Sequence, residues 1–119
     1  MLPIVKYILR QYKGCATKRG LAWKLSDSDF QRLIDEPCVY CGDVATNTAK
    51  RTQYAIATYV YNGIDRINSS QDYTISNCVS CCKACNAAKS DVPLHVFLSS
   101  EWLQDRLHRV NQLRELGRY

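Results

Sequence analysis

Two short cysteine pairs constrain this chain more than any other feature of its sequence. The first pair lies in CVYC, residues 38–41, and the second lies in CKAC, residues 82–85. Two C-x2-C turns of this kind supply the four thiolates of a structural zinc site. The predicted Zn²⁺ ligands are Cys38, Cys41, Cys82 and Cys85. A chain of 119 residues buries only a modest core, which a bound metal would help to stabilise.

Three further cysteines leave alternatives open. Cys78 and Cys81 form an overlapping C-x2-C segment, CVSC, which is a rival for the second zinc pair. Cys15 has no partner at a ligand spacing, so we expect a thiol in the core. Free buried cysteines would explain the same residues, because thiols behave as small hydrophobic groups. The repeated spacing favours zinc.

The N-terminal segment and the cysteine usage predict a location. No apolar run reaches 18 residues, so we expect no transmembrane helix and no membrane partner. The start interleaves apolar residues with Lys6 and Arg10 and lacks the cleavage site of a signal peptide. We therefore expect a cytosolic or nuclear compartment, where paired cysteines are metal ligands rather than disulfides, and we assign the protein to the cytoplasm (the host cytoplasm, if the source is viral).

Positive charge is concentrated near the N-terminus. The net charge is +5, and the first 24 residues contain lysine and arginine but no acidic residue. A basic helix is typical of nucleic-acid binding, although an ordinary solvated helix face gives the same pattern. The predicted nucleic-acid contacts are Lys6, Arg10, Lys13, Lys18, Arg19 and Lys89.

Hydrophobic periodicity predicts helices at both ends of the chain and strands between them. The predicted elements are a helix over 3–19, an extended stretch over 21–25, a helix from Ser26 to Pro37, strands in 52–67 with a turn at Asn62–Gly63, a loop over 69–74, and helices from 82, over 94–98 and over 102–116. No linker divides the chain. We predict one domain, with a basic helical region (1–36), a zinc core (37–90) and C-terminal helices (91–119).

The predicted strands and the helix after them bring polar residues together. Asp65 falls on the hairpin, and Asn86 falls in the first helical turn after Cys85. A carboxylate and an amide oxygen suit Mg²⁺ or Mn²⁺. Asn77 can hydrogen-bond across the intervening loop and hold the hairpin against the helix. Each residue also has a local explanation, as a turn cap, a helix-start residue or a loop residue, but their combination beside a zinc site favours an active site.

These segments resemble a known family. PCVYCG and GIDRINSSQDYTISNCVSCCKACNAAKS resemble the HNH (ββα-metal, or His-Me finger) endonucleases, in the zinc-ribbon branch common in phages and mobile elements. CKACNAAKS is also similar to a helix of the phage Holliday-junction resolving endonuclease. The resemblance covers about residues 5–98 and includes the upstream YKGCATKRGLAWKLSDSDFQRLI. It implies an α+β fold: a small ββα-metal core with a four-cysteine zinc site, flanked by N- and C-terminal helices.

The resemblance also implies residue roles and a partner, double-stranded DNA. Asp65 and Asn86 would bind the catalytic Mg²⁺ or Mn²⁺, and Asn77 would be the middle residue of the motif. Most relatives carry a general-base histidine where this chain has Arg66 or Asn68, and neither residue can act as a base. We assign Arg66 instead to the scissile phosphate, whose developing charge it would stabilise. His95 we expect to be half-buried and structural.

Two functions follow. The favoured one is a metal-dependent HNH-type DNA endonuclease of phage or mobile-element origin that hydrolyses phosphodiester bonds. The alternative is a catalytically degenerate HNH-fold zinc protein that serves as a nucleic-acid-binding or assembly module.

Overall fold

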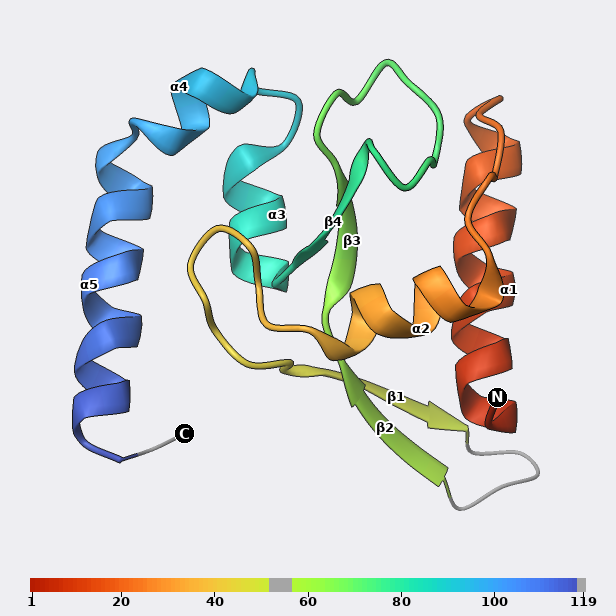
Figure 1. Ribbon diagram of the computed structural model, residues 1–119, viewed down its shortest axis with the longest axis horizontal. Helices are drawn as coiled ribbons and strands as arrows, with labels where there is room; N and C mark the ends of the chain where they lie inside the picture. The colour runs from red at the N-terminus through yellow and green to blue at the C-terminus, as the bar shows by residue number, and fades with distance from the viewer. Residues whose placement is uncertain (52–56, 118–119) are drawn as a thin grey trace.

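Helices from the two ends of the chain lie on opposite sides of the molecule, and the middle of the chain forms the strands and a short helix between them (Figure 1). The computed structural model describes residues 1–51 and 57–117. Within these residues the helices are α1 (Pro3–Lys18), α2 (Asp27–Asp35), α3 (Lys83–Lys89), α4 (Leu94–Leu98) and α5 (Glu101–Glu115), and the strands are β1 (Asn47–Arg51), β2 (Ala57–Tyr61), β3 (Gly63–Arg66) and β4 (Cys78–Cys81). The predicted helices are confirmed to within one or two residues at each end.

The strands form two separate antiparallel pairs. β1 pairs with β2, and β3 pairs with β4, where Asp65 lies opposite Val79. The predicted hairpin turn at Asn62–Gly63 is therefore wrong, because the chain passes there from one sheet into the other. Asn62 is fully buried, and its side-chain amide donates to the Glu36 carbonyl at 2.9 Å. Residues 52–56, in the segment predicted as strand, lie outside the described residues.

A close approach between α1 and β3 explains the glycine at this junction. A Cβ atom on Gly63 would lie 2.9 Å from the Tyr12 hydroxyl and 3.4 Å from the Cys81 carbonyl oxygen. The Ile64 amide donates to the same hydroxyl at 3.3 Å. Gly63 thus lets the first helix reach the strand that contains Asp65.

The larger hydrophobic core lies between α1, α2 and the second strand pair. Its buried residues follow the helical spacing that the sequence predicted for each helix: Ile4, Val5, Ile8 and Leu9 of α1, and Phe30, Leu33 and Ile34 of α2. Ser26 caps α2 as predicted, since its hydroxyl accepts from the Asp29 amide at 3.1 Å. This packing leaves Lys6, Arg10 and Lys13 on the exposed face of α1.

A second core forms where α4 and α5 cover the cysteines. Phe97, Leu103 and Val110 are buried there with five cysteines, at the end of the molecule opposite α1 (Figure 1). Leu116, which fits the periodic pattern, is 76% exposed because α5 has passed the core by that point. Among the described residues, no helix combines the length and apolar character needed to cross a membrane.

Candidate functional site

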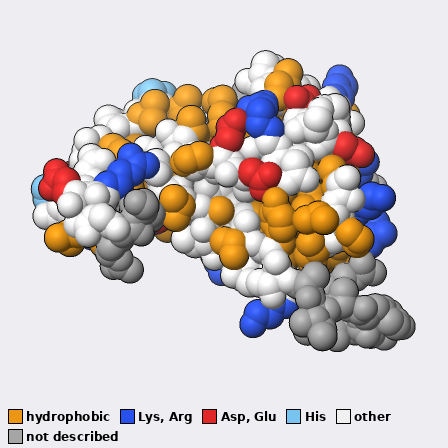
Figure 2. Space-filling view, turned by 60° about the horizontal axis from the view of Figure 1, so that its bottom comes forward, with side chains coloured by type: hydrophobic (Ala, Val, Ile, Leu, Met, Phe, Trp, Pro, Cys, Tyr) orange, Lys and Arg blue, Asp and Glu red, His pale blue; other side chains and the backbone are white. Residues whose placement is uncertain are grey.

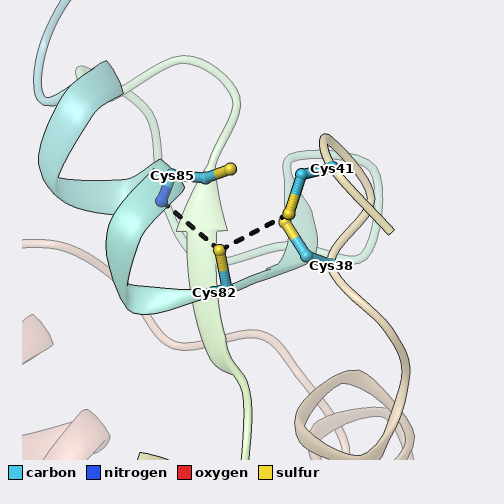
Figure 3. A group of neighbouring side chains, drawn as sticks. All are labelled: Cys38, Cys41, Cys82 and Cys85. Atoms are coloured by element: carbon cyan, nitrogen blue, oxygen red, sulfur yellow. Dashed lines mark hydrogen bonds between the residues drawn. The ribbon is translucent and has the colours of Figure 1, made fainter. Parts of the chain in front are cut away.

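Four cysteine side chains converge near the point where β4 leads into α3. Cys38 and Cys41 come from the loop between α2 and β1, while Cys82 and Cys85 come from the start of α3 (Figure 3). All four are buried, their sulfur atoms lie within 4.8 Å of one another, and Cys41 Sγ is 3.7 Å from Cys82 Sγ. A tetrahedral zinc ion with Zn–S bonds of about 2.3 Å needs sulfurs about 3.8 Å apart. The cluster therefore fits a zinc ion.

Strand geometry excludes the rival cysteine pair. Cys78 and Cys81 both lie in β4, and residues three apart on a strand point to opposite faces. Cys78 is buried in the larger core, whereas Cys81 lies beside the cysteine cluster and its Sγ donates to the Cys82 carbonyl at 3.4 Å. Hydrogen bonds, first from Cys41 and then from the neighbouring thiols, lower the pKa of the Cys38 thiol. This favours the thiolate at Cys38, while the hydrogen bonds with Cys38 raise the pKa of the Cys82 and Cys85 thiols.

An arginine from α5 reaches the cysteine centre. Arg106 Nη2 lies 2.8 Å from Asp43 Oδ2 and 3.9 Å from Cys82 Sγ. Asp43 is itself part of the first cysteine turn, since its carbonyl accepts from the Cys38 amide at 2.9 Å. The guanidinium would offset part of the negative charge of four thiolates. No sequence motif marks Arg106, and it was not predicted.

Asp65, on β3, is anchored through one carboxylate oxygen. Its exposure is 6%, the Tyr40 hydroxyl donates to Oδ2 at 2.6 Å, and Lys89 Nζ lies 3.2 Å from the same oxygen. Burial, and then the contact with Asp65, raise the pKa of Tyr40, so its hydroxyl stays protonated and acts as a donor. Among the described residues, no hydrogen bond is made to Asp65 Oδ1.

The prediction that Lys89 contacts nucleic acid needs correction. Its side chain is 1% exposed, and its ammonium group is engaged by Asp65 and by the Arg66 carbonyl at 3.4 Å. A buried lysine requires such partners, because an unpaired ammonium inside a protein is costly. Lys89 is therefore part of the Asp65 environment and is not available to phosphate.

Asn86 is exposed on α3 and lines the same pocket as Asp65. The pocket has a volume of about 340 Å³. The side chains around it are mainly polar or charged and include Arg19, Asp65, Arg66, Asn86, Ser90 and Asp91. Two potential oxygen ligands for a hard cation, a carboxylate and an amide, thus face one cavity.

The pocket continues on both sides of Asn86. One extension, of about 290 Å³, runs along α1 past Cys15 and Arg19, and another, of about 530 Å³, runs past Thr48 and Lys83. All three cavities share Asn86, and we call the region that they occupy between α1 and α3 the groove. Cys15 is exposed in this groove, so the prediction of a core thiol is wrong. Lys83 was missed, because nothing in the sequence places it beside α1.

Asn77 closes the loop between β3 and β4. Its Oδ1 accepts from the Asn68 amide at 2.9 Å, and its Nδ2 donates to the carbonyls of Asn68 and Asp72 at 3.1 and 3.0 Å. Arg66 supports the same loop, with Nη1 donating to the carbonyls of Ser69 and Gln71. These hydrogen bonds hold the loop in place. We had predicted that Asn77 would hold the strands against α3, but its side chain bonds to the backbone of the loop instead.

Basic side chains border the groove unevenly. Figure 2 shows lysine and arginine side chains along the edge of the molecule where α1 lies. Arg19 lines the groove, whereas Lys6, Arg10, Lys13 and Lys18 are exposed on α1 outside the three cavities.

The two histidines lie away from Asp65. His95 on α4 is exposed, where a half-buried position had been predicted, and His108 on α5 is also exposed. Neither lines the groove around Asn86.

Comparison with known proteins places this arrangement among nuclease folds. The chain shares the fold of an HNH endonuclease, and its β3, β4 and α3 follow one another as a ββα unit. Superposition on the rare-cutting HNH restriction endonuclease PacI gives a TM-score of 0.62 at 18% identity, over 95% of this chain and 81% of PacI. The predicted α+β fold, with a four-cysteine cluster and flanking helices, is confirmed.

A sequence relative comes from a virus. The chain is 33% identical over 88 residues to the uncharacterized protein R423 of Acanthamoeba polyphaga mimivirus. The aligned segment is 74% of this chain but only 14% of the viral protein, so the chain matches a small part of that relative. No family model matches the sequence.

Proposed function

We propose that this protein is a metal-dependent endonuclease of HNH type that hydrolyses phosphodiester bonds in double-stranded DNA. The observation that carries the proposal is the meeting of Asp65 and Asn86 in one polar pocket on the ββα unit. The cysteine centre supports both residues, because Asn86 directly follows Cys85 and Asp65 is bonded to Tyr40 of the first cysteine turn.

Asp65 and Asn86 are the residues that would hold Mg²⁺ or Mn²⁺, since both offer the hard oxygen atoms these cations prefer. A cation held there supplies Lewis-acid stabilisation of charge on the phosphate and on the leaving oxygen. Zn²⁺ in the cysteine centre would be structural, because four thiolates leave no open position for substrate.

Arginines on two walls of the pocket are suited to bind the scissile phosphate. Arg19 ends α1 on one side, and Arg66 lies on the other, with its guanidinium 5.1 Å above the Tyr73 ring. Planar guanidinium groups match phosphate geometry and stay charged. Arg66 would therefore combine a loop contact with a phosphate contact.

The attacking water needs a group that accepts its proton. Asp91 is exposed and lines the same pocket as Asp65 and Asn86. We assign the proton-accepting role to its carboxylate, because Asp65 is buried and already paired with Lys89. Asp91→Asn keeps the shape of the side chain and removes this basicity, so cleavage should fall by about 10²–10⁴-fold.

The groove supports a proposed path for DNA. A strand placed over Asn86 would run between α1 and α3, with Arg19 on one side and Lys83 on the other. The exposed lysines and arginines of α1 would contact phosphates beyond the groove. The similarity to a mimivirus protein supports a viral or mobile-element origin, and with it a host-cytoplasmic location. Branched DNA is included among the substrates, on the resemblance of the CKACNAAKS helix to a junction-resolving enzyme.

Plasmid cleavage tests the proposal. Purified protein should nick or linearise plasmid with Mg²⁺ or Mn²⁺, and the reaction should stop when both cations are left out of the buffer. Asn86→Ala should be inactive, while Asn111→Ala, an exposed position on α5, should cleave like the wild type. Equal cleavage by Asn86→Ala and wild type would contradict the assignment of the site.

One observation favours a second function. The Asp65 carboxylate is already paired with the Lys89 ammonium, and no histidine lines its pocket within the described chain. A protein that binds DNA tightly but leaves plasmid and branched substrates intact with either cation would be a binding or assembly module on the same scaffold.

A further inference from the structure

Tyr40 links the cysteine centre to the proposed cleavage site. It is the third residue of the first cysteine turn, between Cys38 and Cys41. Its ring packs edge-on against Phe97 of α4, with centroids 5.2 Å apart, and its hydroxyl reaches Asp65 Oδ2 at 2.6 Å. The turn and α4 therefore fix where the hydroxyl points, and that direction is toward Asp65.

Lys89 approaches the same carboxylate from α3. Its Nζ lies 3.2 Å from Asp65 Oδ2, and it follows Cys85 by four residues, one helical turn along α3. Both partners of Asp65 are thus carried by elements that the cysteine centre joins. Their two contacts converge on one oxygen atom of the carboxylate.

We propose that Tyr40 and Lys89 are positioning residues that hold Oδ2 of Asp65 and thereby present Oδ1 to the metal-binding pocket. The inference rests on the proposed function and assigns to the cysteine centre the control of the cleavage-site geometry. Groups that bond to a metal-binding carboxylate commonly orient it in this way. The zinc turn would then act on catalysis without contacting substrate.

Tyr40→Phe is the informative variant, because it removes one hydroxyl and keeps the packing against Phe97. Lys89→Met is less informative, since it would leave the buried Asp65 carboxylate without a cation and would lower stability. Tyr59→Phe is a matched control: the Tyr59 hydroxyl also donates to an aspartate, Asp35 Oδ1, at 2.5 Å, but on α2 and away from the groove.

The test compares the wild type with the two tyrosine variants. We would measure zinc content, the Mn²⁺ dissociation constant by electron paramagnetic resonance, and the cleavage rate as a function of Mg²⁺ concentration. For Tyr40→Phe we expect an unchanged zinc content, Mn²⁺ binding weakened by about 10–100-fold, and cleavage partly restored by high Mg²⁺. Tyr59→Phe should match the wild type in all three measurements.

The outcomes separate the two proposals. If wild type binds Mn²⁺ and cleaves DNA, and Tyr40→Phe equals Tyr59→Phe, the positioning role is wrong and the endonuclease proposal stands. If Tyr40→Phe loses zinc, the hydroxyl serves the cysteine turn, and the inference is again overturned. A wild-type protein that binds no Mn²⁺ would overturn the inference together with the proposed cation site.

Discussion

The cysteine centre and the Asp65 pocket are neighbours built in opposite ways. The cysteine centre gathers four buried sulfur atoms of the same kind from two turns. The Asp65 pocket combines one buried carboxylate with one exposed amide, and polar side chains leave it open to a ligand. Structural zinc sites are closed and catalytic sites keep open positions, so the contrast agrees with a structural role proposed for the cysteine centre and a catalytic role proposed for the pocket.

The contrast extends to how each site balances charge. Arg106 lies at the rim of the cysteine centre, where it faces Cys82 and Asp43. Lys89 lies inside the Asp65 environment and is as buried as the core. A cation at the rim would adjust the charge of a site that the proposed zinc ion holds together, whereas a buried ammonium neutralises a carboxylate that would otherwise lack a charged partner.

Zinc removal should have the largest effect, and it tests whether the cysteine centre stabilises the fold. Chelation, or Cys82→Ser, should unfold the domain, because structural zinc contributes about 10–16 kcal/mol of binding free energy in small zinc domains. Circular dichroism and zinc analysis would measure the loss. Cys78→Ser is the control, and it should keep its zinc, since Cys78 lies in the other core. Zinc lost from Cys78→Ser but kept by Cys82→Ser would show that the ligand set is wrong.

The two proposed cation ligands should respond differently to alanine. Asn86→Ala should abolish cleavage and change the free energy of unfolding by less than about 0.5 kcal/mol, because Asn86 is exposed. Asp65→Ala should abolish cleavage and also cost about 3–5 kcal/mol, because it leaves Lys89 buried without a partner. Denaturant unfolding measures the difference. The double variant Asp65→Ala/Lys89→Met should recover much of this loss, and equal stability of the two single variants would argue against the buried ion pair.

Substitution of Arg106 should change the affinity for zinc without directly changing the Asp65 pocket. Arg106→Met should weaken zinc binding by about 10–100-fold, because the thiolates lose a compensating positive charge. Competition with a chromogenic chelator gives the affinity. Arg109→Met, an exposed change on the same helix, provides the comparison and should bind zinc normally. An effect of equal size from both variants would point to helix stability instead.

Substitutions on the basic face of α1 should have the smallest effect, and that effect should be on DNA binding. Replacing Lys6, Arg10 and Lys13 by alanine should weaken DNA binding for all sequences and reduce the slope of log affinity against log salt by about 0.9 for each phosphate that the protein no longer neutralises. Fluorescence anisotropy across a salt series measures the slope. Arg19→Ala, inside the groove, should reduce cleavage more than binding. A slope unchanged by the triple substitution would remove α1 from the DNA interface.

Much of the architecture could be predicted from local sequence, because it depends on short-range chemistry. Helix periodicity and capping located α1, α2, α4 and α5, and the C-x2-C spacing selected zinc-type ligands. The ββα unit was recognised from residues 63–90, because the candidate site residues of the motif all lie within this short segment. The turn at Asn62–Gly63 was wrong because a turn signal cannot tell a hairpin from a crossing between two sheets.

Only the tertiary structure decided between the rival cysteine pairs and found the partners of Asp65. Cys78 and Cys81 have an acceptable ligand spacing, but strand geometry turns them to opposite sides of β4. Lys89 was predicted from the sequence to contact nucleic acid, and no sequence feature marked Tyr40 as a functional residue. Both contact Asp65 because the cysteine centre folds residues far apart in the chain against β3, and contacts that depend on such long-range packing leave no local pattern.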